Sequence, residues 1–241
     1  MTMTLSIVVP VKDEAPNVGV LAREITAALV NEPHYEIIFV DDGSTDGTSL
    51  ALSQLKSEIP HLRIIRHARN AGQSRALRTG VNAARGEFIA TLDGDGQNDP
   101  ADLPKLLAEI RDGSSDLGMI AGIRAKRRDN WTKRAASQIA NRFRNWVLRD
   151  GATDTGCGLK AFRRAAFLNL PYFDHMHRYL ITLMLREGYR VGYVQVSHRP
   201  RLHGHSKYGV WDRALVGITD LLGVRWLQHR FRGGAFKTEE L

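Results

Sequence analysis

Cysteine is almost absent from this sequence: Cys157 is the only one among 241 residues, so no disulfide can form within the chain. Long apolar runs are also lacking, and none approaches the roughly 18–20 residues that a membrane-spanning helix needs. The first ten residues are too short and too strand-like for a signal peptide. No internal repeat and no linker marks a second domain. We therefore expect one domain over residues 1–230, with a basic amphipathic segment from about residue 209 and a loose tail over 231–241.

Acidic residues are outnumbered, since 34 Lys and Arg face 26 Asp and Glu and leave a net charge of +8. This excess favours an anionic partner: a nucleotide, a phospholipid surface or a nucleic acid. Charge alone does not choose among the three. The proportions of hydrophobic residues, 43%, and charged residues, 25%, are those of an ordinary globular protein.

Short apolar runs alternate with helical patterns along the first half of the chain. We expect strands over residues 5–10, 36–40, 62–66, 87–92 and 116–121. We expect helices from Pro16 onward and over 48–57, 74–84 and 102–111. Such alternation indicates βαβ units, so the predicted fold class is α/β with a mainly parallel central sheet.

The second half contains two amphipathic segments, a basic helix expected over 126–149 and a helix after residue 209, with a strand over 191–197 between them. Their large apolar residues are Trp131, Phe143, Trp146, Trp211, Leu215, Ile218, Leu222 and Trp226. Two readings are open. The segments rest on an anionic membrane interface with their aromatic rings at headgroup depth, or they pack on the sheet with their charges in water.

Polar clusters follow three of the expected strands, at residues 12–14, 41–42 and 93–98. The carboxyl ends of parallel strands lie at one edge of a sheet, and ligands bind there beside a topological switch point. The three clusters therefore predict one binding site.

The cluster Asp93-Gly94-Asp95-Gly96-Gln97 predicts a metal site. Two carboxylates in a glycine-flanked turn after a buried strand suit Mg²⁺ or Mn²⁺, which prefer oxygen ligands and bind phosphates with one or two carboxylates. Such a cation neutralises the charge that develops on a diphosphate leaving group. An isolated pair of this kind is more often a solvated turn, but here it coincides with two other acidic loops.

Three further segments admit two readings each. Ser44 and Asp46 cap the next helix, while Asp42 contacts a ligand. Residues 69–74 hold a phosphate at a helix start, or form a tight turn with close helix packing at Gly80. Residues 201–207 form a mobile diphosphate clamp, or a solvated loop.

Four histidines and the cysteine are given structural rather than chemical roles. No matching ligand pair supports a zinc site at His203 and His205. We expect His175 and His177 to be structural or surface residues. Cys157 has no identifiable base beside it and is expected to be a small packed residue.

Taken together, the motifs resemble glycosyltransferase family 2, and within it the dolichyl- and polyprenyl-phosphate mannose synthases. The matching segments, in the family's order, are residues 8–14 (VVPVKDE), 41–48 (DDGSTDGT), 69–77 (RNAGQSRAL), 92–100 (LDGDGQNDP), 154–164 (DTGCGLKAFRR) and 201–209 (RLHGHSKYG). This resemblance implies a GT-A fold, a Rossmann-like three-layer architecture.

The resemblance also implies roles for individual residues. Asp95, Arg201 and Lys207 would be catalytic, and the metal would be surrounded by Asp93, Asp95 and Gln97. The nucleotide sugar would be bound by Pro10, Glu14, Val40, Asp42, Asp93, Gly94, Asp95, Gln97, Arg124, Arg201 and Lys207. The acceptor phosphate would face Arg124, Arg134 and Ser137, with Lys133 competing with Arg134.

The implied activity is transfer of a sugar from GDP-mannose or a UDP-sugar to a polyprenyl or dolichyl phosphate, with Mg²⁺ or Mn²⁺. A phosphate acceptor is already an anion and needs no general base, so a single displacement would invert the anomeric centre. The enzyme would be peripheral on the cytoplasmic face of a membrane, and a membrane-protein partner is left open.

Three rival hypotheses remain at this stage. The nearest is a family 2 transferase with a soluble sugar or glycan acceptor. A nucleic-acid-binding protein should show a recognised module or an aromatic stacking platform, and neither is present. A catalytically idle membrane scaffold conflicts with the intact DGDGQ and SKY segments.

Overall fold

The computed structural model describes residues 3–124, 142–200 and 210–231. Its strands are β1 Leu5–Val11, β2 Tyr35–Asp41, β3 Leu62–Arg66, β4 Phe88–Thr91, β5 Leu117–Arg124, β6 Lys160–Arg163 and β7 Arg190–Val196. Its α-helices are α1 Ala15–Ala28, α2 Thr48–Leu55, α3 Gln73–Ala83, α4 Leu103–Asp112, α6 Arg164–Leu168, α7 Leu180–Arg186 and α8 Val210–Arg230. Two 3-10 turns are η1 Pro100–Asp102 and η2 Met176–Arg178.

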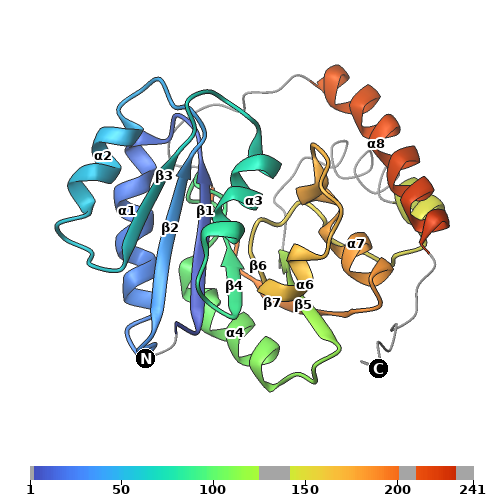
Figure 1. The fold of residues 1–241 in the computed structure, drawn as a ribbon, viewed down its shortest axis with the longest axis horizontal. Coiled ribbons are helices and arrows are strands. Elements are labelled where there is room, and N and C mark those ends of the chain that lie inside the picture. The colour runs from blue at the N-terminus through green and yellow to red at the C-terminus, as the bar shows by residue number, and fades with distance from the viewer. Residues whose placement is uncertain (1–2, 125–141, 201–209, 232–241) are drawn as a thin grey trace, which may run out of the picture.

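All seven strands form one sheet in the order β3-β2-β1-β4-β6-β5-β7 (Figure 1). Every pairing is parallel except the two made by β6, which runs antiparallel to both β4 and β5. The predicted α/β class with a mainly parallel sheet is therefore confirmed. The strand β6 was not predicted, because its four residues carry neither an apolar run nor an alternating pattern.

Helices cover both faces of this sheet, which gives the predicted three layers (Figure 1). Helices α1, α2 and α4 share one apolar core, and α3, α6, α7 and α8 share the other. The central strand β1 shows why: Ile7 and Val9 belong to the first core, while Val8, between them, belongs to the second. A strand buried on both sides reads as a continuous apolar run, as residues 5–10 do.

Within residues 217–230 of the C-terminal helix α8, the apolar side chains divide between the core and the surface. Leu221 and Val224 are buried, whereas Ile218, Leu222 and Trp226 are 54%, 63% and 58% exposed. In the part of the chain that the structure describes, no helix is both long enough and apolar enough to cross a bilayer. The predicted tail lies outside the described residues except for Phe231.

Candidate active site

The three polar loops meet where the chain leaves β1, β2 and β4, which are adjacent parallel strands. Strand β1 lies between β2 and β4. The chain continues from β1 to β2 and β3 on one side of it, and then returns to β4 on its other side. This is the switch point at which open α/β sheets bind their ligands. The predicted convergence of the clusters is thus a feature of the structure.

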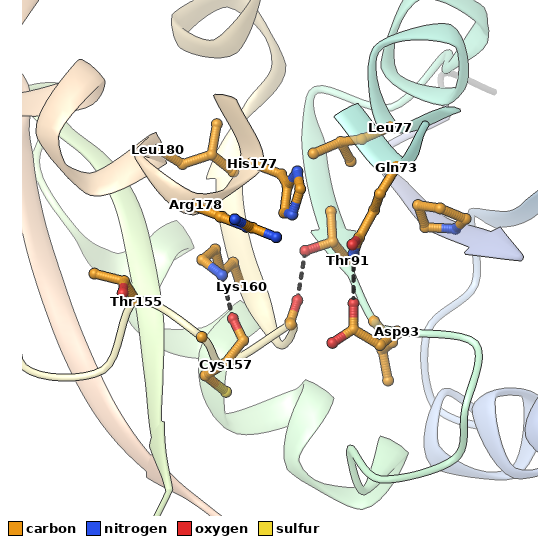
Figure 2. A pocket seen from close by; sticks show the side chains of 14 residues that line it. Gln73, Leu77, Thr91, Asp93, Thr155, Cys157, Lys160, His177, Arg178 and Leu180 are labelled. Atoms are coloured by element: carbon orange, nitrogen blue, oxygen red, sulfur yellow. Dashed lines mark hydrogen bonds between the residues drawn. The ribbon is translucent and has the colours of Figure 1, made fainter. Parts of the chain in front are cut away.

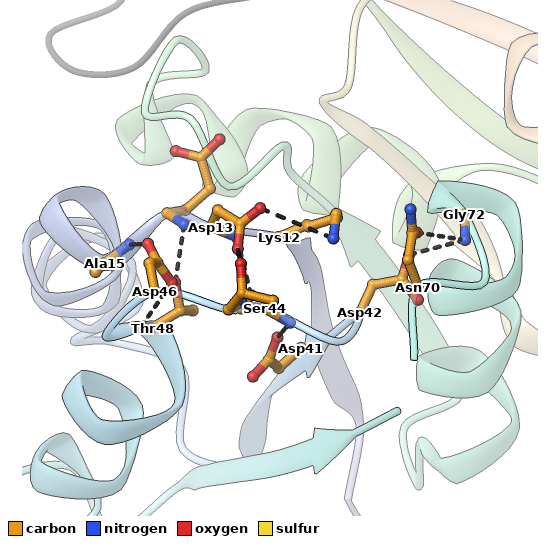
Figure 3. Close-up of polar contacts among 12 residues, drawn as sticks. Lys12, Asp13, Ala15, Asp41, Asp42, Ser44, Asp46, Thr48, Asn70 and Gly72 are labelled. Carbon is orange, nitrogen blue, oxygen red and sulfur yellow. Dashed lines mark hydrogen bonds and ion pairs between the residues drawn. The ribbon is translucent and has the colours of Figure 1, made fainter. Parts of the chain in front are cut away.

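The loops after β1 and β2 are tied together by side chains (Figure 3). The Asp13 amide donates to Ser44 Oγ at 2.8 Å, and the Thr45 amide donates to Asp13 Oδ1 at 2.8 Å. The predicted cap by Asp46 is wrong, because the N-cap of α2 is Gly47; the Asp46 carboxylate lies one residue earlier and accepts from the Thr48 amide at 2.9 Å. Ser44 does not cap α2, because its hydroxyl is used by the neighbouring loop.

Asp42 holds the turn that begins helix α3. One carboxylate oxygen accepts from His67 Nδ1 at 2.7 Å and from the Ala71 amide at 2.8 Å, and the other accepts from the Gly72 amide at 2.8 Å. The residue is 4% exposed. The anion at this helix start is therefore the protein's own carboxylate, and the role of Asp42 toward a ligand stays a prediction.

The alternative reading of residues 69–74, a tight turn with close packing at Gly80, agrees with the structure. Gly72 adopts a φ of +89°, a conformation that side-chain-bearing residues rarely adopt. A Cβ added to Gly80 would lie 2.4 Å from Val8 Cγ1, so only glycine lets α3 approach β1 this closely.

Three predicted nucleotide-binding residues occupy different settings. Val40 is fully buried in the core beneath α3. Glu14 accepts from Asn17 Nδ2 at 2.6 Å. Pro10 borders the pocket described below. Their contacts with a nucleotide stay predictions.

Asp93 and Asp95 follow β4 as predicted, in a structured turn. Asp93 Oδ1 accepts from Gln73 Nε2 at 2.9 Å, and Asp95 Oδ1 accepts from the Gln97 amide at 3.1 Å. Burial, together with the charge of Asp95, raises the pKa of Asp93. The negative charge of Asp95 makes ionisation of Asp93 more costly, and a cation bound between the two carboxylates would relieve this repulsion. Gly94 between them is packed against Val11.

Among the described residues, no three His, Cys, Asp or Glu side chains gather as a metal cluster. A metal at Asp93 and Asp95 would thus take its remaining ligands from the side-chain carbonyl oxygen of Gln97, from water or from a bound phosphate. Mg²⁺ is commonly held in this way.

A pocket of about 340 Å³ opens beside Asp93 (Figure 2). It lies between the end of β4, the start of α3, the loop over residues 155–158 and the η2 turn. Thr91 Oγ1 donates to the Gly158 carbonyl at 2.8 Å, and Lys160 Nζ donates to the Cys157 carbonyl. These bonds fix the loop against the sheet.

The sequence reasoning missed most of the residues that line this pocket as site residues, among them Gln73, Lys160, His177 and Arg178. His177 was predicted to be structural or on the surface; it lines the pocket and also bonds Ser74 Oγ through Nδ1 at 2.8 Å. Burial lowers the pKa of His177 to about 3.

Cys157 is packed as predicted, at 1% exposure, and burial raises the pKa of its thiol.

Arg124, predicted to bind both the nucleotide sugar and the acceptor phosphate, forms a bidentate ion pair. Its Nε and one terminal nitrogen donate to the two carboxylate oxygens of Asp154, each at 2.7 Å. The side chains are 10% and 14% exposed. Arg124 therefore anchors the loop after Asp154. The other predicted cations and their neighbours lie outside the described residues: Lys133, Arg134, Ser137, Arg201 and Lys207.

The model of the family described as "Glycosyl transferase family 2" matches residues 6–170. A dodecaprenyl-phosphate galacturonate synthase of Rhizobium johnstonii is 36% identical; the match covers 98% of this chain and 70% of that protein. An undecaprenyl-phosphate 4-deoxy-4-formamido-L-arabinose transferase of Aeromonas hydrophila is 32% identical over 86% of this chain and 63% of its own length.

Solved structures resemble the fold. A glucosyl-3-phosphoglycerate synthase of Mycobacterium tuberculosis, crystallised with Mn²⁺, UDP-glucose and phosphoglyceric acid, aligns with a TM-score of 0.70 at 16% identity. The alignment covers 94% of this chain and 79% of that one. At this identity the likeness concerns the fold alone.

The family match, the two relatives and a GT-A fold with paired aspartates at the end of β4 agree with one another. The chain belongs to glycosyltransferase family 2 and is a glycosyltransferase.

Proposed function

We propose that this chain transfers a sugar from a nucleoside diphosphate sugar to a polyprenyl phosphate, with Mg²⁺ or Mn²⁺ bound by Asp93 and Asp95. The observation that carries the proposal is the position of these carboxylates in the turn after β4. This turn lies at the same sheet edge as the loops that follow β1 and β2, and Asp93 also lines the pocket. Relatives named for polyprenyl-phosphate products support the choice of acceptor.

A bound divalent cation supplies charge neutralisation for the departing diphosphate. The chain's own residues set up that site. Gln73 holds the Asp93 carboxylate from α3, and the Gln97 amide holds Asp95 within its turn. Gln97 itself, with Arg201 and Lys207, completes the proposed contacts to the metal and diphosphate.

The pocket chemistry is consistent with an acceptor that is already an anion. His177 is the neutral base that borders the pocket, and with its pKa lowered to about 3 it is a weak proton acceptor. A hydroxyl acceptor needs a competent base near the attacking oxygen, whereas a phosphate oxygen does not. In-line attack on the anomeric carbon then inverts its configuration.

We also propose that the enzyme rests on the cytoplasmic face of a membrane through one apolar surface, the docking face. It consists of Phe143, Trp146, Ile218, Leu222 and Trp226, each more than half exposed. Its two helical segments are neighbours, since Gln228 Nε2 donates to the Leu148 carbonyl at 3.0 Å. Exposed apolar residues on two neighbouring segments favour a membrane or protein contact. A membrane-protein partner stays a prediction.

The test is transfer of labelled sugar from UDP- or GDP-sugars to polyprenyl phosphate in detergent. We expect metal-dependent transfer of the sugar of one donor, with inversion of the anomeric configuration. The transfer rate should fall at least about 100-fold in Asp95→Ala. Asp112→Ala, an exposed aspartate at the end of α4, should match the wild type. Turnover with a soluble acceptor and none with lipid would refute the proposed acceptor and leave the family assignment intact.

A further inference from the structure

The pocket wall that faces Asp93 carries three basic side chains from two separate elements. Lys160 comes from the start of β6, and His177 and Arg178 come from the η2 turn. Figure 2 shows the Arg178 side chain reaching into the pocket between Lys160 and Thr91, on the side opposite Asp93. None of the three is among the residues that the motifs assign to nucleotide, metal or acceptor.

Arg178 differs from two nearby arginines, which are paired with carboxylates of the protein. Arg124 is paired with Asp154, and Arg144 with Asp150. Within the ranges that the structure describes, no carboxylate pairs with Arg178 and its guanidinium makes no hydrogen bond to the protein. A planar group with five donors that is directed into a pocket is suited to an oxyanion ligand.

Lys160 adds a second, deeper charge. The residue is 6% exposed, and its ammonium group donates to the Cys157 carbonyl at the pocket floor. Its carboxylate neighbours are Asp93 and Asp154. Asp154 is already matched by Arg124, and in the proposed function Asp93 serves a divalent cation. The cations left without a matching anion are therefore Lys160 and Arg178.

The turn that carries Arg178 is held in place by its neighbour in the sequence. The preceding residue, His177, makes two hydrogen bonds with Ser74 Oγ, one from its amide at 3.2 Å and one through its ring at 2.8 Å. Ser74 is fully buried in the first turn of α3. His177 is thus a positioning residue, which couples the η2 turn to the helix that also supplies Gln73 to Asp93.

We propose that Arg178, with Lys160 beneath it, forms an oxyanion subsite that receives the phosphate of the lipid acceptor next to the sugar. The inference rests on the proposed function and deepens it. Arg124 is committed to Asp154, which leaves Arg178 and Lys160 as the cations that the described pocket offers to an incoming anion. A carboxylate carried by the donor sugar has the same chemistry and is the other source that the experiment distinguishes.

The experiment compares Arg178→Gln and Arg178→Lys with the wild type. Initial rates are measured against polyprenyl phosphate at saturating donor, and against donor at saturating acceptor. We expect Arg178→Gln to raise the KM for polyprenyl phosphate at least about tenfold, with the donor KM unchanged and partial recovery in Arg178→Lys. Arg190→Gln, an exposed arginine on β7 paired with Asp116, is the matched control.

A donor KM that rises only for a donor carrying a carboxylate would assign the subsite to the sugar and overturn the acceptor assignment. Both KM values within about twofold of wild type, in a variant with an unchanged unfolding midpoint, would overturn the subsite itself.

Binding of inorganic phosphate, measured by calorimetry in the presence of nucleoside diphosphate and Mn²⁺, gives a readout independent of transfer. Phosphate binding that is lost in Arg178→Gln supports the subsite even where lipid transfer fails. Transfer to lipid with phosphate binding equal in both proteins refutes the subsite and leaves the proposed function standing.

Discussion

Contacts with the Asp93 carboxylate are the residue-scale feature on which the candidate site depends. Gln73 donates to it from α3, and the backbone of Gly158 lies directly against it from the loop before β6. A Cβ added to Gly158 would lie 2.2 Å from Asp93 Oδ2 and 2.4 Å from its Cγ. The absence of a side chain at one position thus determines where a proposed metal ligand sits.

Gly158→Ala should therefore displace Asp93 and lower transfer while leaving the fold intact. We expect the rate to fall at least about tenfold, because small displacements of catalytic groups cost one to two orders of magnitude. The measurement is the transfer rate together with its dependence on metal concentration. Gly223→Ala on α8, where an added Cβ meets nothing within 4 Å, is the control. Wild-type activity in Gly158→Ala would show that Asp93 need not occupy this position.

At the scale of elements, the start of α3 connects several parts of the site. Its preceding turn is bound to Asp42 at the end of β2, its first residue holds Asp93, and its second anchors the η2 turn. The loops that follow β2 and β4, together with the pocket wall, are consequently positioned by one helix terminus.

Asp42→Asn should loosen this arrangement and destabilise the protein. The buried carboxylate accepts from two backbone amides and a histidine, and an amide in its place turns a donor toward one of them. We expect a loss of about 2–3 kcal/mol in the free energy of unfolding, measured with urea in the absence of ligand. Asp112→Asn on the exposed end of α4 should change it by less than about 0.5 kcal/mol. A free energy of unfolding equal to that of the wild type in Asp42→Asn would contradict the anchoring role of Asp42.

At the scale of the whole molecule, the docking face belongs to the half of the protein that contains α7, α8 and the pocket wall (Figure 1). That half is the one in which we propose that the lipid phosphate is received. A protein that takes a substrate from a bilayer benefits when its docking surface and its acceptor subsite belong to the same packed unit.

Replacing Leu222 and Trp226 together by Ser should weaken binding to vesicles that contain anionic lipid. Each of the two substitutions removes an exposed apolar side chain from the docking face and leaves the buried core unchanged. We expect at least about a tenfold lower partition coefficient in a sedimentation assay, because interfacial binding scales with buried apolar area. The control, Val30→Ser with Leu50→Ser, removes apolar side chains that are at least as exposed but lie elsewhere, and it should have no effect. Unchanged partitioning of the first pair would refute this docking face.

Much of the site could be predicted from local sequence. The apolar runs that became β1 and β2, and the aspartates that follow them, are contiguous patterns, so their positions along the chain sufficed to predict a parallel sheet with polar loops at one edge. The strand β6 could not be predicted, because four residues of mixed character become a strand only when β4 and β5 lie on either side.

The sequence by itself determined the α/β class, the family and the acidic turn after β4, since each is encoded in neighbouring residues. Tertiary structure alone decided that Asp42 is used internally, that Arg124 is paired with Asp154, and that Lys160 and Arg178 face Asp93 across a pocket. The physical reason is that the charge available to a ligand depends on which side chains are already paired. That pairing is set by contacts between residues far apart in the chain, such as Ser74 and His177.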